Sequence, residues 1–184
     1  AAMGVMFLLF SGIRGMQSID ADRRELTLSR TFASPTTATT YLFGKFFGTV
    51  AIAFCQFIIL ALGTTLLFKV NWGAPLTMLS IALAYSWAVS GMALALASLV
   101  TNNQAATGAW SILVQVFSAL GGSMIPLAVF PPAMRAIAQF TPNYWGLQGL
   151  LAGMQNGPFP WSSVLALLAL GTVTLVVGSF RMRA

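Results

Sequence analysis

The chain lacks histidine, has one cysteine and carries few charges. Of its 184 residues only 7% are charged, whereas soluble domains carry about a quarter. Without histidine, a Ser-His-Asp triad and metal ligation by His are excluded. The single cysteine, Cys55, excludes a disulfide within the chain, and its place in an apolar run predicts a buried free thiol. We therefore expect no catalytic residue, no metal site and no cofactor held by this chain.

Two further absences narrow the function. The phosphate-binding pattern G-x-x-x-x-G-K-[ST] does not occur, since Gly44-Lys45 is followed by Phe46. All three acidic residues, Asp20, Asp22 and Glu25, lie in one polar stretch and none lies inside an apolar run. Carriers driven by protons or sodium ions usually need carboxylates within the membrane. The sequence disfavours a secondary transporter, and any ATP would have to be bound by a partner.

Long apolar runs dominate what is present. The chain is 58% hydrophobic, with a mean hydropathy of +0.85. A spanning helix needs about 20 apolar residues, so the sequence predicts an all-α, polytopic membrane bundle. The five predicted spans are 1–13, 46–68, 76–100, 106–124 and 161–180. The first is too short unless it begins upstream, so we expect a sixth span before it and read 1–184 as one transmembrane domain lacking that span.

The charges predict an orientation. The stretch Arg14–Lys45 holds eight of the chain's twelve charged residues. Placing it inside leaves seven of nine Lys and Arg residues in the cytoplasm, as the positive-inside bias favours. We expect a multi-pass protein of the cytoplasmic membrane with a cytoplasmic C-terminus, and Tyr41 and Trp110 near the inner interface. The net charge of +6 comes mostly from these flanks, so we do not infer nucleic-acid binding.

Local patterns subdivide the polar stretch. Residues 18–33 predict a short interfacial helix with weak amphipathicity. Ser34-Pro35 is typical of a helix start and predicts a helix that continues into the second span. The Gly44-x-x-x-Gly48 spacing favours close packing between helices of this chain, with a dimer face as the alternative.

The segment 125–160 is rich in proline yet apolar, and includes Pro126, Pro131, Pro132 and Pro142. Two short helices, 132–140 and 143–154, separated at Thr141-Pro142, predict a re-entrant hairpin in the outer leaflet. The alternative is a hydrophobic loop on the surface. Gln56 and Gln115 lie inside predicted spans, where they either bond between helices or face a substrate path.

The order of these pieces resembles the permease subunit of ABC type-2 exporters, the class that moves drugs, lipids and polysaccharides. The resemblance covers nearly the whole chain. The residues that carry it are Glu25-Leu-Thr-Leu28, Ala33-Ser34-Pro35, Tyr41-Leu-Phe-Gly44-Lys45, Gly122-Ser-Met-Ile-Pro126 with Pro131-Pro132, and Thr141-Pro142-Asn-Tyr144.

The resemblance implies a permease that hydrolyses no ATP itself. It implies a cytoplasmic coupling helix that docks on a separate ABC ATPase, and a second permease, identical or not, around a central path within the lipid bilayer. The implied docking residues are Arg24, Glu25, Leu26, Thr27, Leu28, Arg30, Phe32, Ser34 and Pro35; those implied for the outer hairpin are Pro126, Pro131, Pro132, Pro142 and Tyr144. An ATP-independent channel or carrier and a structural or assembly membrane protein are the alternatives.

Overall fold

The computed structural model describes residues 1–25, 31, 33, 37–100 and 102–181. For residues 20, 23, 24, 38, 39, 103, 180 and 181 it describes the backbone alone. All regular structure in these ranges is helical. The elements are α1 (Ala2–Arg24), α3 (Ala38–Phe68), α4 (Pro75–Leu99), α5 (Asn103–Leu120), the 3₁₀ turn η1 (Leu127–Val129), α6 (Pro132–Ala138), α7 (Pro142–Met154) and α8 (Trp161–Arg181).

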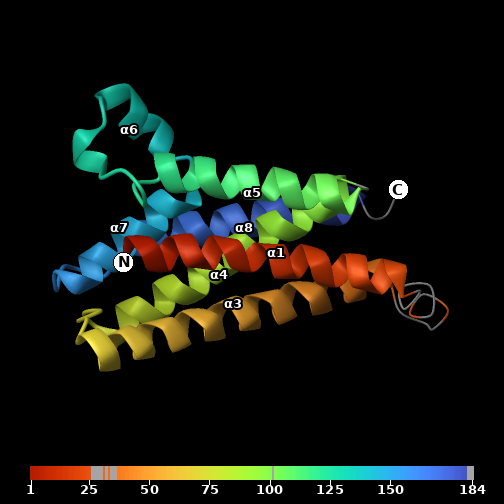
Figure 1. The fold of residues 1–184 in the computed structure, drawn as a ribbon, viewed down its shortest axis with the longest axis horizontal. Helices are drawn as coiled ribbons and strands as arrows, with labels where there is room; N and C mark the ends of the chain where they lie inside the picture. Colours follow the sequence, from red (N-terminus) through yellow and green to blue (C-terminus); the bar gives the residue numbers. More distant parts are fainter. Residues whose placement is uncertain (26–30, 32, 34–36, 101, 182–184) are drawn as a thin grey trace.

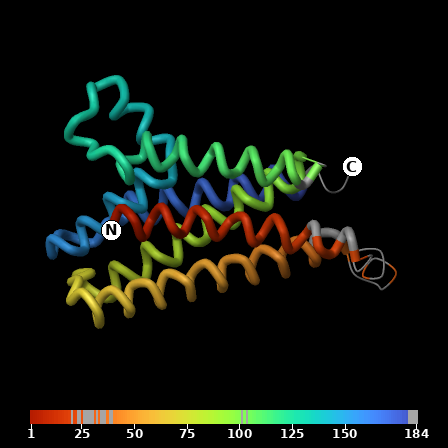
Figure 2. Tube along the Cα trace, viewed as in Figure 1, coloured from red at the N-terminus to blue at the C-terminus, as the bar shows by residue number. Residues whose placement is uncertain are grey.

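The long helices run side by side in a bundle, with the short ones gathered at one end (Figure 1). α4 packs against α1, α3, α7 and α8, and α1 packs against both α3 and α5. The C-terminal end of α1, the start of α3 and the C-terminal end of α8 lie at one end of the bundle (Figure 2). The α3–α4 turn, α6 and α7 lie at the other. The order of the elements therefore places the charged stretch and the C-terminal helix end together.

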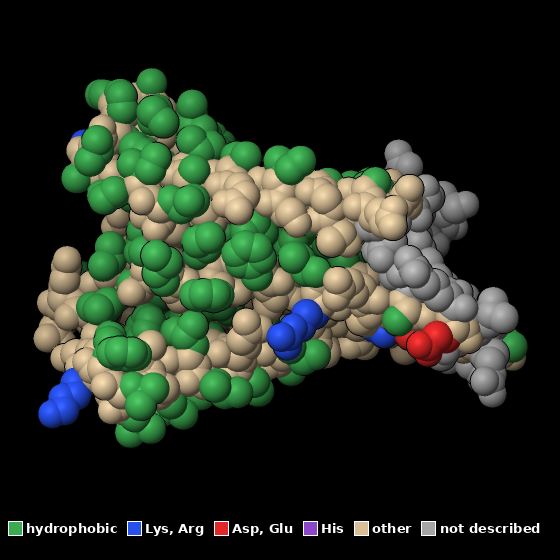
Figure 3. All heavy atoms as spheres, in the orientation of Figure 1, with side chains coloured by type: hydrophobic (Ala, Val, Ile, Leu, Met, Phe, Trp, Pro, Cys, Tyr) green, Lys and Arg blue, Asp and Glu red, His purple; other side chains and the backbone are tan. Residues whose placement is uncertain are grey.

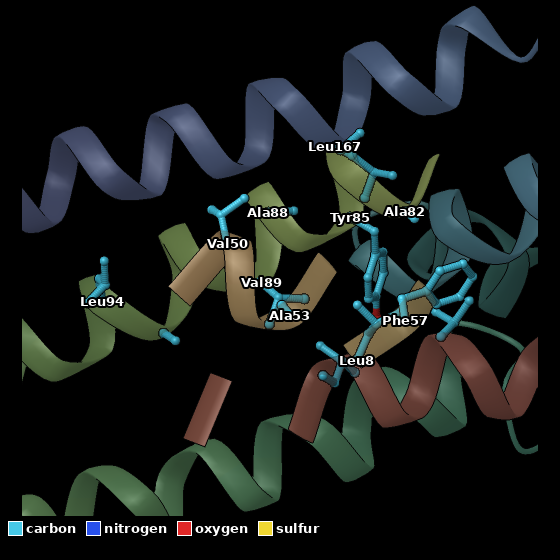
Figure 4. Packing of buried hydrophobic residues seen from close by; sticks show 14 of the residues in the cluster. Leu8, Val50, Ala53, Phe57, Ala82, Tyr85, Ala88, Val89, Leu94 and Leu167 are labelled. Carbon is cyan, nitrogen blue, oxygen red and sulfur yellow. The ribbon is translucent and has the colours of Figure 1, made fainter. Parts of the chain in front are cut away.

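The core forms where α1, α3, α4 and α8 meet. Figure 4 shows Ala53 of α3 close to Val89 of α4, Phe57 of α3 near Tyr85 and Leu8, and Leu167 of α8 above α4; all are buried, as is Val50 of α3. The other labelled side chains are Ala82, Ala88 and Leu94. The abundance of alanine and glycine lets the helices approach closely, as in membrane bundles, where hydrophobicity alone does not separate helix from lipid.

Small residues join α4 to α8 most closely. A Cβ at Gly91 would overlap the carbonyl oxygen of Gly171, and a Cβ at Gly171 would lie 2.9 Å from Ala88 Cα. Gly91 and its alanine neighbours serve packing within the chain, because Ala93, Ala95 and Ala97 are also buried.

Four helices in the described part of the chain are long and apolar enough to span a membrane: α1, α3, α4 and α8. We expected five. α5 is not among the four, because Asn103, Gln104 and Gln115 interrupt its apolar sequence. The expectation for the first span is also wrong. α1 does not end near Ile13 but continues to Arg24, and its apolar window, Ala2–Ile19, contains Arg14.

Two predicted helices around the polar stretch also differ in extent from the structure. The interfacial helix predicted from Ser18 does not begin there, because Ser18 to Arg24 form the last turns of α1. The helix predicted from Ser34 does not run unbroken into the second span, because α3 begins at Ala38; Ser34 and Pro35 lie outside the described residues. The N-cap of α3 is Thr37, whose side chain accepts a hydrogen bond from the Thr40 backbone N–H; this is the usual means of satisfying a free amide at a helix start.

Candidate functional site

The charged end of the bundle is held by four side chains, Ser18 and Asp22 of α1 and Tyr41 and Lys45 of α3, which we call the clasp. Lys45 Nζ lies 2.8 Å from Asp22 Oδ2 and donates to Ser18 Oγ at 2.7 Å and to the Ser18 carbonyl at 3.2 Å. Tyr41 OH donates to the same Asp22 oxygen at 2.6 Å. Lys45 also lies 5.8 Å from the centre of the Tyr41 ring. The clasp ties the end of α1 to the start of α3.

The clasp keeps Asp22 ionised. Partial burial acts to raise the pKa of this carboxyl, but hydrogen bonds from Lys45 and Tyr41 and the positive charge of Lys45 outweigh burial, so the pKa falls below its usual value. About a quarter of the Lys45 side chain stays exposed, and a pair of this kind contributes about 0.2–1 kcal/mol. Its main effect is to position the two helices.

The clasp residues flank, in sequence, the stretch that the resemblance assigns to docking: two precede it on α1 and two follow it on α3. Arg24 is the last residue of α1, and Glu25 follows it as an exposed turn residue. Leu26, Thr27, Leu28, Arg30, Phe32, Ser34 and Pro35 lie outside the described residues. A force applied to this stretch would therefore reach α1 and α3 together, through Asp22 and Lys45.

Arg14 does not lie where the charge pattern placed it. We assigned it to the cytoplasmic flank, yet it stands inside the apolar window of α1. Its side chain is exposed and has neither ion pair nor hydrogen bond with any residue that the structure describes. The sequence did indicate that Arg14 stands apart from the other charges. It precedes the dense charges at residues 20–25 by six residues, which is more than one helical turn.

The two glutamines proposed to face a path lie on different helices. Gln115 is exposed on α5. Gln56 is half-buried on α3, and its Oε1 is buried without a hydrogen-bond partner in the described part of the chain. Gln56 and Arg14 line one surface groove. The prediction that these amides bond between helices therefore has no support at Gln56.

The opposite end of the bundle contains the two short helices predicted from the proline-rich segment. Pro126 caps η1, Pro131 caps α6, and Pro132 and Pro142 open α6 and α7. These helices are confirmed within a few residues of their predicted limits. Tyr144 is half-buried, with its ring edge-on to Trp145. Whether the pair enters a bilayer stays a prediction.

A buried polar network, which the sequence analysis missed, fixes α7. The Tyr85 hydroxyl donates to Asn143 Oδ1, and Asn143 Nδ2 donates to Ser123 Oγ at 3.0 Å and to Ser118 Oγ at 3.4 Å. These bonds join α4, α7 and the end of α5. An Asn directly after the helix-opening Pro142, in an apolar segment, was the available signal, because buried amides are almost always hydrogen-bonded.

Comparison with known proteins agrees with this arrangement. Residues 1–155 match the family described as ABC-2 type transporter. The whole chain also aligns with the linearmycin resistance permease protein LnrN of Bacillus subtilis (strain 168), with 25% identity over 188 residues. The chain spans about half the length of that relative, 49%. Because the family match covers most of its length, this chain belongs to the ABC-2 type transporters, as a non-catalytic membrane permease domain.

Proposed function

We propose that this chain is the membrane part of an ATP-driven exporter that moves lipophilic compounds across the cytoplasmic membrane. ATP is hydrolysed by a separate ABC ATPase, which docks on residues 24–35. A second permease, identical or related, completes the path. The C-terminus and the docking stretch lie in the cytoplasm, and α6 and α7 form a re-entrant pair on the outer side.

The clasp is the observation that best supports this mechanism. It joins the two helices that flank the docking stretch through Lys45 and Asp22, 2.8 Å apart. A channel that works alone has no need to tie together the two spanning helices that flank a charged stretch. For an ATP-driven permease the same connection carries movement of the partner into α1 and α3, the helices that also bear Arg14 and Gln56.

The nature of the cargo is proposed from two sources. The aligned Bacillus protein is named a resistance permease, which favours export of a toxic compound. The described helices also present many large apolar side chains at the surface, including Phe7, Ile52 and Ile59, which suits movement of cargo that is itself dissolved in the bilayer. A structural or assembly protein without transport is the remaining alternative.

The test is stimulation of ATP hydrolysis by the full permease–ATPase complex in liposomes. We expect Glu25→Lys and Leu26→Asp to abolish the stimulation that the permease gives while insertion stays normal. Both replacements reverse the character of a side chain in a helix-in-groove contact. If both variants keep full stimulated activity, docking on this stretch is wrong.

Arg24→Ala serves as the matched control, because it lies in the same stretch and changes a charge expected at the rim of the contact. Rim charges affect the rate of encounter more than affinity. A mild effect of Arg24→Ala beside a severe effect of Glu25→Lys supports a specific contact. Equal effects of the two would argue against a specific contact at Glu25, and net charge would not explain them, because the two changes shift it in opposite directions.

A further inference from the structure

Two adjoining surface grooves between α1 and α3 form one continuous depression, which we call the α1–α3 furrow. The larger groove has a volume of about 480 Å³, and the one toward the clasp about 210 Å³. Arg14 and Ile52 line both. The lining residues used in the argument are Arg14, Gly48, Ile52, Cys55, Gln56 and Ile59.

Glycines keep the furrow open. At Gly44 and Gly48 an added Cβ would have no described atom within 4 Å, so the prediction that this pair packs helices within the chain is wrong. At Gly15 a Cβ would lie 2.8 Å from Thr49 Cγ2. The helices therefore touch at Gly15 and leave space beside that contact, where Gly44 and Gly48 carry no side chain to fill it.

Arg14 is the unusual group in this furrow. It lies eight residues before Asp22 on the same helix, about 12 Å along the axis, well inside the apolar window Ala2–Ile19. A charge at mid-depth of a bilayer costs about 2.5–3.5 kcal/mol on the insertion scale. The charge of Lys45 is paired with the carboxylate of Asp22, but Arg14 has no partner among the described residues. Figure 3 shows the largely uncharged surface in which the few basic groups of this face stand.

The chain has no counter-ion to spare for Arg14. Its only acidic residues are Asp20, Asp22 and Glu25, all six or more positions toward the charged end, and Asp22 is engaged by Lys45. A second copy seated over the furrow would bring a second Arg14 and no carboxylate at this depth. The described residues therefore supply no opposite charge at this depth, and a molecule that enters the furrow would supply it.

We propose that the α1–α3 furrow binds a membrane-borne anionic amphiphile, a single apolar chain with a carboxylate or phosphate head, as cargo of the exporter. The head pairs with the Arg14 guanidinium, which can hold two oxygens side by side. Gln56 lines the same groove as Arg14, beside the place of the head. The apolar tail lies along Ile52 and Ile59. This proposal rests on the proposed function and names its substrate class.

The chain contains its own reporter for the test. Cys55 is the single cysteine, is exposed, and lines the furrow with Arg14, so the prediction of a buried thiol is wrong. In nanodiscs of phosphatidylcholine, without ATP, the full permease–ATPase complex is treated with N-ethylmaleimide. We expect dodecanoic acid to slow modification of Cys55 and dodecylamine, with the same chain and the opposite charge, to leave it unchanged.

Variants assign the effect to the guanidinium. Arg14→Gln should weaken protection by dodecanoic acid about tenfold, the size expected for a lost charge-assisted hydrogen bond, whereas Arg14→Lys should retain most of it. Lys69→Gln is the matched control. It removes the same charge from another surface groove of about 480 Å³, lined by Lys69 and Trp72, and should leave protection intact.

Three results would overturn the proposal: unchanged protection in Arg14→Gln, equal protection by dodecylamine, or a Cys55 that does not react before any amphiphile is added. The last would mean that protein covers the furrow. The rate of ATP hydrolysis distinguishes a transported cargo from a lipid that merely occupies the furrow. Dodecanoic acid should stimulate the complex with Arg14 and not with Arg14→Gln. If phosphatidylglycerol in the nanodisc protects Cys55 equally and nothing stimulates hydrolysis, the site holds lipid and cargo binding is rejected.

The two proposals can fail separately. Protection of Cys55 does not require coupling to ATP hydrolysis. If the complex binds dodecanoic acid but is insensitive to Glu25→Lys, the proposal for the docking stretch is refuted and the proposal for the furrow is retained. If Glu25→Lys uncouples the complex but dodecanoic acid gives no protection of Cys55, the proposal that the furrow binds cargo is refuted and the proposed exporter function is retained.

Discussion

A single glycine sets the distance between α1 and α5. A Cβ at Gly12 would overlap the Trp110 indole, which is buried and donates from Nε1 to the Leu9 carbonyl at 3.0 Å. The bond joins the ring to the α1 backbone, so the ring cannot withdraw without leaving a buried donor unpaired. Gly12 is therefore required by packing and not by backbone conformation.

Gly12→Ala should destabilise the permease by about 1–3 kcal/mol, as overpacking of a close contact does. Thermal unfolding of the purified protein in detergent measures the effect. Gly108→Ala on α5 is the control, because a Cβ there would meet no described atom within 4 Å. Removing a helical glycine in open space should instead be neutral or stabilising by up to about 1 kcal/mol. Equal melting temperatures for the two variants would contradict this account.

Single residues were the hardest to predict from the sequence. Cys55 was expected in the core and is exposed, and the burial of Trp110 against Gly12 was not predicted. Both lie in helices that are apolar on nearly every side, where hydrophobicity does not indicate which face meets a neighbour. Arg14 and Asn143 broke the apolar pattern, so their importance was visible in the sequence although their partners were not.

Helix pairs are joined by a few polar contacts, and the clasp gives one of them a pH dependence. The folded-state pKa of Asp22 is lowered, so its contribution is fully present above the unfolded value of about 3.9 and is lost as the pH falls through the folded value. Asp22→Asn should lower the melting temperature by a similar amount from pH 8 to pH 5, and the difference should shrink as the pH falls below about 3.9.

Melting curves of the wild-type protein and Asp22→Asn between pH 3 and pH 8 check this. The control is the exchange Asp22→Lys with Lys45→Asp, which keeps both charges and should recover part of the lost stability, whereas either change alone should not. A difference between wild type and Asp22→Asn that grows as the pH falls below 5 would refute the clasp as the cause.

Helices were predicted well where the physical signal is local. The limits of α4 and α8 lie within one residue of those predicted, because proline or tryptophan opens each apolar run. The end of α1 was missed because a helix passes through charged residues when its neighbours hold it, as Lys45 holds Ser18 and Asp22. α3 begins at Ala38, and not at the predicted Ser34, because Thr37 supplies the cap. Nearby Ser and Thr residues offer equivalent caps, so the sequence does not decide between them.

At the scale of the whole molecule, the order of elements in the sequence and their two ends in space agree. The C-terminal end of α1, the start of α3 and the C-terminal end of α8 lie at one end, and the proline-rich helices lie at the other (Figures 1 and 2). This follows from helix number and short connections, which the sequence predicts well. Which end faces the cytoplasm depends on the bilayer and rests on the charge distribution alone.

Single-cysteine labelling tests that orientation. In a Cys55→Ser background we expect Ser29→Cys to resist a membrane-impermeant maleimide in intact cells and to react after the membrane is opened. Gln155→Cys, on the exposed turn after α7, should react in intact cells. The reason is the excess of Lys and Arg around position 29, which the positive-inside bias keeps in the cytoplasm. Labelling at 29 but not at 155 in intact cells would invert the permease, place the clasp outside, and remove the docking stretch from the reach of any ATPase.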